Sequence, residues 1–237
     1  MSLAASTKPL IDYPDSDGEP MSDNTVQFDW IATLKWSADS YFRDDPQVFV
    51  AGDHLIYTVE GEREIRQAPD VYVVFGRPKG HRGSYKVWEE AGIFPQVIFE
   101  VWSPRNGDTL TVEKLAFYER YGAEEHYIIY PEFPAHVAGW LREGDSLVRV
   151  PQINGFVSPR LGFRFEIQTG EVRIYGPDNK ELVSPLEVFR ERDYEREQAE
   201  LQRLRAEAEK QRAEAEKQRA DQFAAMLRKL GVDVDTL

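Results

Sequence analysis

The sequence contains no cysteine, which excludes a disulfide framework and a thiolate metal site. It also lacks any apolar run that approaches the roughly 18 residues a membrane-spanning helix needs, so no membrane segment is expected. Residues 1–25 carry five acidic side chains and lack the basic and then apolar regions of a secretory signal peptide. Together these absences predict a cytoplasmic protein.

Basic charge is scarce. The chain of 237 residues has 29 Lys and Arg against 42 Asp and Glu, which gives a formal net charge of −13. A general nucleic-acid binder is normally basic, so this balance argues against that class. It does not exclude an enzyme that acts on nucleic acid, because metal ions can neutralise part of a carboxylate-rich site and a local basic patch can hold phosphates.

Glycine and proline are absent from Leu186 to Leu230, where Glu, Arg, Lys, Gln and Ala dominate. We therefore predict a globular domain at 1–185 and a charged helical tail at 186–237. The tail repeats Arg-Ala-Glu-Ala-Glu-Lys-Gln, and a seven-residue period is typical of a coiled coil, which predicts a homo-oligomer. The seam is weak, so a single solvated helix is an equal alternative. The seam residues are Leu201, Leu204, Ala208 and Ala215.

The globular part alternates apolar strands with helical patterns. A helix capped by Asp23 or Asn24 is predicted to run to Tyr41. Strands are predicted at 69–75, 96–102 and 126–130, a strand pair at 48–59, a helix at 109–121, and hairpins at 138–150 and 163–175. A strand, a crossover helix and a strand indicate a partly parallel sheet. The predicted fold class is therefore α/β with a mixed sheet.

Two carboxylates stand on apolar strands. Asp70 begins a strand that is apolar on both faces, and Glu100 shares one face of its strand with Ile98 and Trp102. A buried lone carboxylate is costly unless a partner pairs with it. A hard cation such as magnesium, which prefers oxygen ligands, suits two carboxylates on neighbouring strands. The alternatives are that Asp70 forms a turn and that an arginine pairs with Glu100.

The helix after the Glu100 strand carries a lysine on its apolar face. At 100° per residue, Phe117, Tyr118 and Tyr121 surround Lys114. Lys114 is therefore expected to point towards the sheet or a cleft. The alternative is a lysine whose stem packs on the tyrosines while its ammonium group reaches water.

A basic loop follows the Asp70 strand. It contains Arg77, Lys79, Arg82 and Lys86 and no acidic residue. On an acidic protein this loop predicts a local positive patch for nucleic-acid phosphates. The alternative is an ordinary surface loop.

These residues, in this order, resemble the Uma family of restriction endonucleases in the PD-(D/E)XK nuclease superfamily. The resemblance covers about residues 10–185, and the tail is similar to one found on some members. The motifs that carry it are Pro69-Asp70, Phe99-Glu100-Val101-Trp102-Ser103-Pro104, Asp108, Lys114-Leu115, Phe117-Tyr118, Tyr121-Gly122 and Glu125-His126-Tyr127.

The resemblance implies a restriction-endonuclease-like core, with a central mixed sheet flanked by helices. It implies that Asp70 and Glu100 bind Mg²⁺ or Mn²⁺, with the backbone carbonyl of Val101 as a further ligand. The superfamily's lysine two residues after the glutamate is replaced here by Trp102. In the Uma pattern a helix lysine stands in, which makes Lys114 the third catalytic residue.

Family members also have an acid or polar residue near the first helix, where Glu19, Asn24 and Gln27 are candidates. The implied function is metal-dependent hydrolysis of DNA phosphodiester bonds. A different class of function is a catalytically silent nuclease fold that binds or assembles through its tail, which the acidic charge and Trp102 favour. A third is a metal-dependent hydrolase of another phosphate ester.

Overall fold

A computed structural model describes residues 11–103 and 107–229, and at residues 107 and 108 it describes the backbone alone. Pro104, Leu230 and the side chain of Asp108, which belong to the predicted motifs and tail, lie outside this description. The chain divides into two compact units, Met1–Pro185 and Leu186–Leu237, and each is described by itself.

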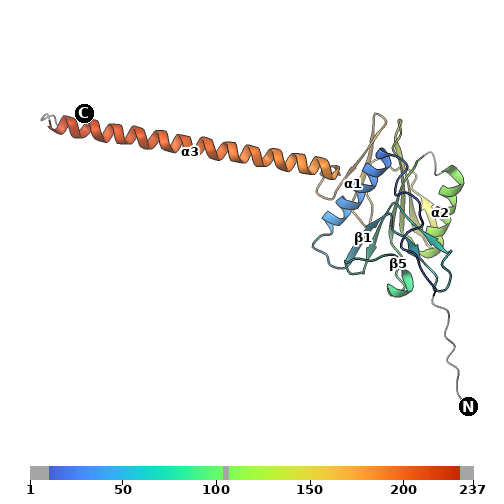
Figure 1. Cartoon of the computed structure of the whole chain (residues 1–237). Helices are drawn as coiled ribbons and strands as arrows, with labels where there is room; N and C mark the ends of the chain where they lie inside the picture. The colour runs from blue at the N-terminus through green and yellow to red at the C-terminus, as the bar shows by residue number, and fades with distance from the viewer. Residues whose placement is uncertain (1–10, 104–106, 230–237) are drawn as a thin grey trace, which may run out of the picture. The chain divides into compact units, whose positions relative to one another are not determined.

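A six-stranded mixed sheet forms the centre of the first unit (Figure 1). In spatial order its strands are β1 (Val48–Gly52), β4 (Val71–Phe75), β6 (Val97–Val101), β7 (Glu125–Tyr130), β8 (His136–Glu143) and β9 (Ser146–Arg149). Strands β6 and β7 pair in parallel, and the other neighbours pair antiparallel. Helix α2 (Gly107–Tyr121) makes the crossover that a parallel pair requires. The predicted α/β class with a mixed sheet is confirmed.

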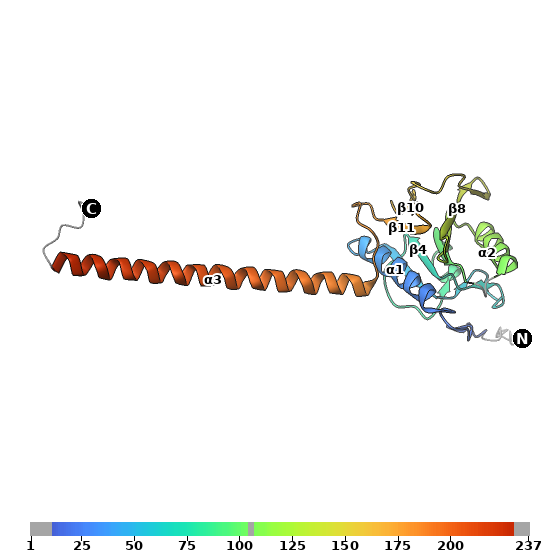
Figure 2. The same ribbon diagram turned by 90° about the horizontal axis from the view of Figure 1, so that it is seen from above.

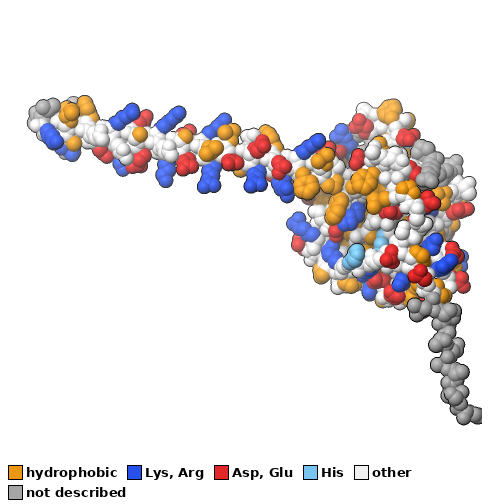
Figure 3. Space-filling model, viewed as in Figure 1, with side chains coloured by type: hydrophobic (Ala, Val, Ile, Leu, Met, Phe, Trp, Pro, Cys, Tyr) orange, Lys and Arg blue, Asp and Glu red, His pale blue; other side chains and the backbone are white. Residues whose placement is uncertain are grey.

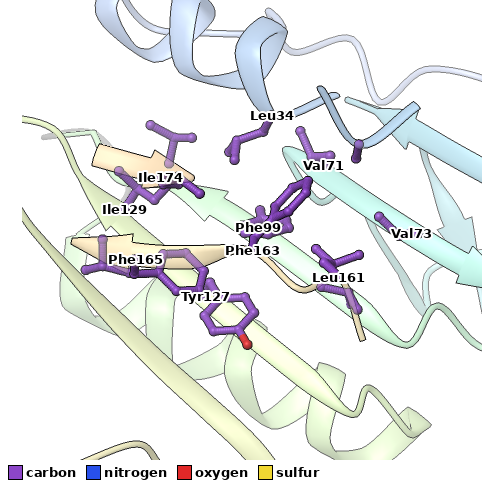
Figure 4. Close-up of a cluster of buried hydrophobic side chains, with 14 of the residues drawn as sticks. Leu34, Val71, Val73, Phe99, Tyr127, Ile129, Leu161, Phe163, Phe165 and Ile174 are labelled. Atoms are coloured by element: carbon purple, nitrogen blue, oxygen red, sulfur yellow. The ribbon is translucent and has the colours of Figure 1, made fainter. Parts of the chain in front are cut away.

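Two helices cover opposite sides of this sheet (Figure 2). On one side lies α1 (Thr25–Tyr41), which begins where the Asn24 side chain accepts a hydrogen bond from the Gln27 backbone N–H. Hairpin β10 (Arg164–Gln168) and β11 (Glu171–Tyr175) packs on the same core. Figure 4 shows that core, in which side chains of the sheet meet those of α1 and the hairpin, among them Leu34, Phe99, Tyr127, Phe165 and Ile174.

The other face of the sheet packs against α2 and a small second sheet. That sheet contains β3 (Arg66–Gln67), β2 (Ile56–Tyr57) and β5 (Tyr85–Lys86), and a 3₁₀ turn at Val87–Glu89 follows it. Its core joins aromatic side chains of several elements, including Phe49, Tyr72, Tyr85 and Tyr118. Helix α2 contributes the buried side chain of Tyr118, and its partly buried Leu115, Phe117 and Tyr121 pack against the same core.

The predicted strand pair within 48–59 is wrong. Strand β1 pairs with β4, and β2 belongs to the small sheet between β3 and β5. Asp53 has a left-handed backbone with φ of 44°, which turns the chain away from β1. Leu55, Ile56 and Tyr57 are all buried. The sequence around β2 therefore shows no alternation of apolar and polar residues that would indicate which strand it pairs with.

The two predicted hairpins are confirmed. Strands β8 and β9 pair antiparallel around Gly144, and β10 and β11 pair around Thr169 and Gly170. All three turn residues have positive φ. Gly144 and Gly170 adopt such a backbone without a steric penalty.

The second unit contains all but the first residue of helix α3 (Pro185–Lys229), which is 45 residues long and has no buried residue among those described. Figure 3 shows charged side chains of both signs along it. Both a solvated helix and one strand of a coiled coil fit this description, so the coiled coil stays a prediction. Within residues 11–103 and 107–229, no helix is long and apolar enough to cross a membrane.

Candidate active site

The antiparallel pairing of β4 and β6 brings the two predicted carboxylates together. Val71 lies opposite Phe99, and continuing this register by one residue places Asp70 opposite Glu100. Opposite residues project from the same face of a sheet, so the two side chains are neighbours. Both are buried, with 8% and 4% of their surface exposed. The Asp70 carboxylate also accepts a hydrogen bond from the Val101 backbone N–H at 2.6 Å.

Helix α2 supplies two partners to Glu100. The Lys114 ammonium group donates to Glu100 Oε2 at 2.7 Å, and the Tyr118 hydroxyl donates to Glu100 Oε1. The prediction that Lys114 points towards the sheet is confirmed, and the partner of Glu100 is a lysine instead of an arginine. Tyr118 was not predicted as a site residue. The sequence feature that indicates it is its spacing of four residues from Lys114, which places both side chains on one helix face.

The electrostatics of this cluster favour binding of an additional proton or cation. Burial and then the neighbouring Glu100 raise the pKa of Asp70 to about 8. Burial alone would lower the pKa of Lys114, but Glu100 and then Asp70 outweigh it and raise that pKa above its ordinary value. Lys114 is therefore protonated at neutral pH. One ammonium group does not neutralise two ionised carboxylates, so Asp70 retains a proton at neutral pH, which a divalent cation could displace.

An acidic cleft of about 370 Å³ opens beside Asp70 and Lys114. Its further acidic lining residues are Asp17, Glu19, Asp23 and Asp53. Burial and then Asp17 raise the pKa of Asp53, whose backbone N–H donates to the Asp70 carbonyl. Asp17 and Asp53 were missed by sequence reasoning, because each stands in a glycine-containing turn sequence that is typical of an ordinary loop.

The three candidates near the first helix take different positions. Gln27 is buried, and its Nε2 donates to the Val101 carbonyl at 3.0 Å. Its Oε1 accepts from the Asp23 backbone N–H. Asn24 is the helix cap, and Glu19 lines the cleft wall. Gln27 is therefore the candidate that contacts a predicted metal ligand.

The basic loop residues do not join this cluster. Arg77 and Arg82 both pair with Glu90, Lys79 pairs with Asp39, and Lys86 pairs with Glu89. These four basic residues are not among the described residues that line the cleft. Acidic residues just after the loop and on α1 neutralise a stretch that contains no acid of its own.

A comparison with protein families agrees with the resemblance drawn from the motifs. A family model described as Uma2, "Putative restriction endonuclease", matches residues 17–213. The chain belongs to the Uma2 family. The match continues beyond Pro185 into α3. Membership supports a nuclease function, that is, a hydrolase acting on phosphodiester bonds.

A solved structure similar to this Uma2 chain is titled "Crystal structure of a putative nuclease belonging to DUF820 from Anabaena variabilis ATCC 29413". It is 10% identical, has a TM-score of 0.43, and the alignment covers 57% of this chain and 72% of that one. No curated protein matches the chain.

The acidic side chains around Asp70 offer oxygen donors instead of sulfur or nitrogen donors. Within the described residues, no group of three or more His, Cys, Asp or Glu side chains is placed to hold a metal. Asp70, Glu100 and the Val101 carbonyl offer hard oxygen atoms, the donor type that magnesium and manganese prefer. Trp102, two residues after Glu100, packs near the Tyr130 ring, with 5.8 Å between the centroids.

A buried histidine adjoins the Uma2 site on the α2 side. A cavity of about 10 Å³, roughly the size of one water molecule, is lined by His126 together with Glu100 and Lys114. Neither ring nitrogen of His126 has a hydrogen-bond partner among the described residues. Burial and then Lys114 lower the pKa of His126 to about 3, so the ring is neutral at physiological pH.

Proposed function

We propose that the acidic cleft is the active site of a divalent-metal-dependent endonuclease that hydrolyses DNA phosphodiester bonds. The observation that carries this proposal is the buried pair of Asp70 and Glu100 beside a single protonated lysine. Burying two carboxylates together costs free energy, so such a pair is typical of a site that gains a cation or a proton in function. Membership of the Uma2 family supports the nuclease assignment.

Asp70, Glu100 and the Val101 carbonyl would hold Mg²⁺ or Mn²⁺. When bound, such an ion supplies a Lewis acid for the phosphate and lowers the pKa of a coordinated water. Gln27 orients the Val101 carbonyl, and the Val101 N–H fixes the Asp70 carboxylate. The backbone around Val101 is therefore held from both sides in one position.

Lys114 would stabilise negative charge that develops on the phosphate oxygens. It lines the acidic cleft, and its ammonium group is fixed in place by Glu100. A charge that is already oriented needs no reorganisation during the reaction. Trp102 carries no charge, so Lys114 is the residue able to take the role of the superfamily's strand lysine.

The basic loop would hold the phosphates that flank the cleaved bond. Arg77 and Arg82 form largely buried ion pairs with Glu90, so their role is to hold the basic loop to the segment that contains Glu90. Lys79 and Lys86 pair with more exposed acids and can exchange them for phosphate at little cost. Removing both lysines should lower the slope of log affinity against log salt by about 1.8, since each phosphate contact contributes about 0.9.

A plasmid cleavage assay with magnesium or manganese tests the proposal. The wild-type chain should cut supercoiled DNA, and EDTA should stop the reaction. Asp70→Asn and Glu100→Gln keep side-chain size and should abolish cleavage, whereas Glu64→Gln, at an exposed surface acid, should not. Cleavage at the wild-type rate by either site variant would reject the assigned site.

One observation favours a catalytically silent binding protein as the second candidate. Both carboxylate oxygens of Glu100 already accept hydrogen bonds from Lys114 and Tyr118, so a metal has to compete with these donors. A calorimetric titration with magnesium separates the two candidates. Binding that disappears in Asp70→Asn supports the nuclease, and absence of binding to the wild-type chain supports the silent protein.

A further inference from the structure

Helix α3 carries a stripe of small and apolar side chains with the spacing of a coiled-coil seam. The sequence Arg-Ala-Glu-Ala-Glu-Lys-Gln occurs at 205–211 and again at 212–218. A seven-residue period keeps one stripe of a helix facing a neighbouring helix. The stripe positions alternate three and four residues apart and are called a and d. They are Leu201, Leu204, Ala208, Gln211, Ala215, Gln218, Gln222 and Ala225.

Within one chain this stripe is uncovered. Leu201 and Leu204 are exposed, and no described residue of α3 is buried. Alanine and glutamine bury little apolar surface, so the stripe alone does not identify its occupant. The charged residues on either side of the stripe carry that information.

Acidic residues lie on one side of the stripe and arginines on the other, at the positions called g and e. The g residues are Glu200, Glu207 and Glu214, and the e residues are Arg205, Arg212 and Arg219. Each acid precedes an arginine by five positions, a spacing at which two side chains do not face each other on one helix. Within the described part of the chain, none of the six forms an ion pair.

The five-residue spacing is the one that pairs charges between two parallel helices in register. In that arrangement a g residue of one helix faces the next e residue of the other. Glu200 then faces Arg205 of the second copy, and the two later heptads repeat the pair. In an antiparallel arrangement g faces g and e faces e, which sets acid against acid and arginine against arginine.

The polar stripe positions favour the same register. Gln211 and Gln218 occupy consecutive d positions. In a parallel pair in register each glutamine meets its own counterpart in one layer, where the two amides can bond to each other. A polar residue in a seam specifies register in this way at some cost in stability.

We propose that α3 binds α3 of a second copy of this chain as a parallel, two-stranded coiled coil in register. The interface consists of the stripe and three g-to-e ion pairs on each side. This docking does not depend on the nuclease assignment. A consequence that rests on the proposed function is that two active sites are tethered to the same end of the coiled coil. Tethering raises the concentration of the second site at a DNA duplex held by the first.

Sedimentation of the full chain tests the assembly. The wild-type protein should be a dimer, and the triple variant Arg205→Glu/Arg212→Glu/Arg219→Glu should be a monomer, because every pair becomes repulsive. The matched control makes the same charge change outside the interface, at Arg203→Glu/Lys210→Glu/Lys217→Glu, and should remain a dimer. A wild-type monomer, a trimer, or a triple variant that stays dimeric would overturn the proposal.

Cross-linking tests the orientation. The chain has no cysteine, so Ala225→Cys introduces a single thiol at a d position near one end of α3. In a parallel pair the two thiols meet and should form a disulfide between copies under mild oxidation, and adding the triple arginine change should suppress it. A sedimenting dimer that forms no disulfide would show an antiparallel pair and overturn the proposed orientation. Neither readout needs catalysis, so their failure is distinct from failure of the nuclease assignment.

Discussion

Lys114 Nζ lies 2.7 Å from Glu100 Oε2, and this contact joins helix α2 to the central strand β6 in the buried part of the site. Lys114 therefore has two tasks in the proposed enzyme. It neutralises part of a buried carboxylate pair, and it presents a fixed positive charge to the cleft. Any substitution of Lys114 affects stability as well as cleavage, and the two effects need separate measurements.

Lys114→Met should destabilise the metal-free protein by about 3 kcal/mol, because it leaves Glu100 buried without its counter-charge. The double variant Lys114→Met/Glu100→Gln should recover most of that loss, since the remaining charge is then removed. Urea denaturation in EDTA measures both free energies of unfolding. Strictly additive effects of the two substitutions would contradict the pairing.

The pH dependence of stability should change when Asp70 is neutralised. The folded pKa of Asp70 is about 8, above its ordinary value of 3.8. Between these values the folded metal-free protein retains a proton that the unfolded chain releases, so Asp70 makes stability fall as pH rises through this window. Asp70→Asn removes the penalty. It should therefore stabilise the metal-free protein more at about pH 8 than at about pH 5.

Urea denaturation at the two pH values provides this measurement, with EDTA in each sample. Glu64→Gln is the control, because it changes an exposed acid and should shift stability equally at both pH values. An equal stabilisation by Asp70→Asn at both pH values would show that Asp70 is ionised throughout the window in the folded protein.

The centre of the site could be predicted from the sequence because its signals are local. Strand periodicity placed Glu100 on a defined face, and helical periodicity placed Lys114 on the apolar face of the next helix. Asp70 was identified because it stands at the start of an apolar strand. The structure brings these three residues together because β4 and β6 are adjacent and α2 covers the face they share.

The surroundings of the site could not be predicted, because their contacts join distant segments. Gln27 meets the Val101 carbonyl across 74 residues of sequence. Lys79 meets Asp39 across 40 residues, so the sequence of the basic loop did not indicate that its positive charges are paired. The strand that pairs with β1 was likewise hidden, since both β2 and β4 are apolar on both faces.

Gln27→Met should weaken magnesium binding about tenfold or more while leaving the protein folded. The substitution keeps the length of the side chain but removes the hydrogen bond that orients the Val101 carbonyl. Loss of a group that orients a metal ligand typically lowers affinity 10–100-fold. Calorimetry measures the effect, and Thr33→Val, which removes a side-chain hydrogen bond elsewhere on α1, should not change it. Unchanged affinity in Gln27→Met would remove Val101 from the proposed ligands.

The tail should decide whether the proposed enzyme makes single-strand or double-strand breaks. A parallel pair of α3 helices keeps two nuclease units on one DNA molecule, so the second strand is cut before the complex dissociates. The wild-type chain should then convert supercoiled plasmid largely to linear DNA. The monomeric variant with Glu at 205, 212 and 219 should accumulate nicked circles, although each site is chemically intact.

Gel analysis of the products at equal extents of cleavage measures this difference. The control with Glu at 203, 210 and 217 carries the same net charge as the monomeric variant, so any general repulsion from DNA affects both equally. The control should therefore yield linear DNA as the wild type does. An equal share of linear product from the monomeric variant would mean that a single nuclease unit cuts both strands in succession, and that the tail serves another purpose.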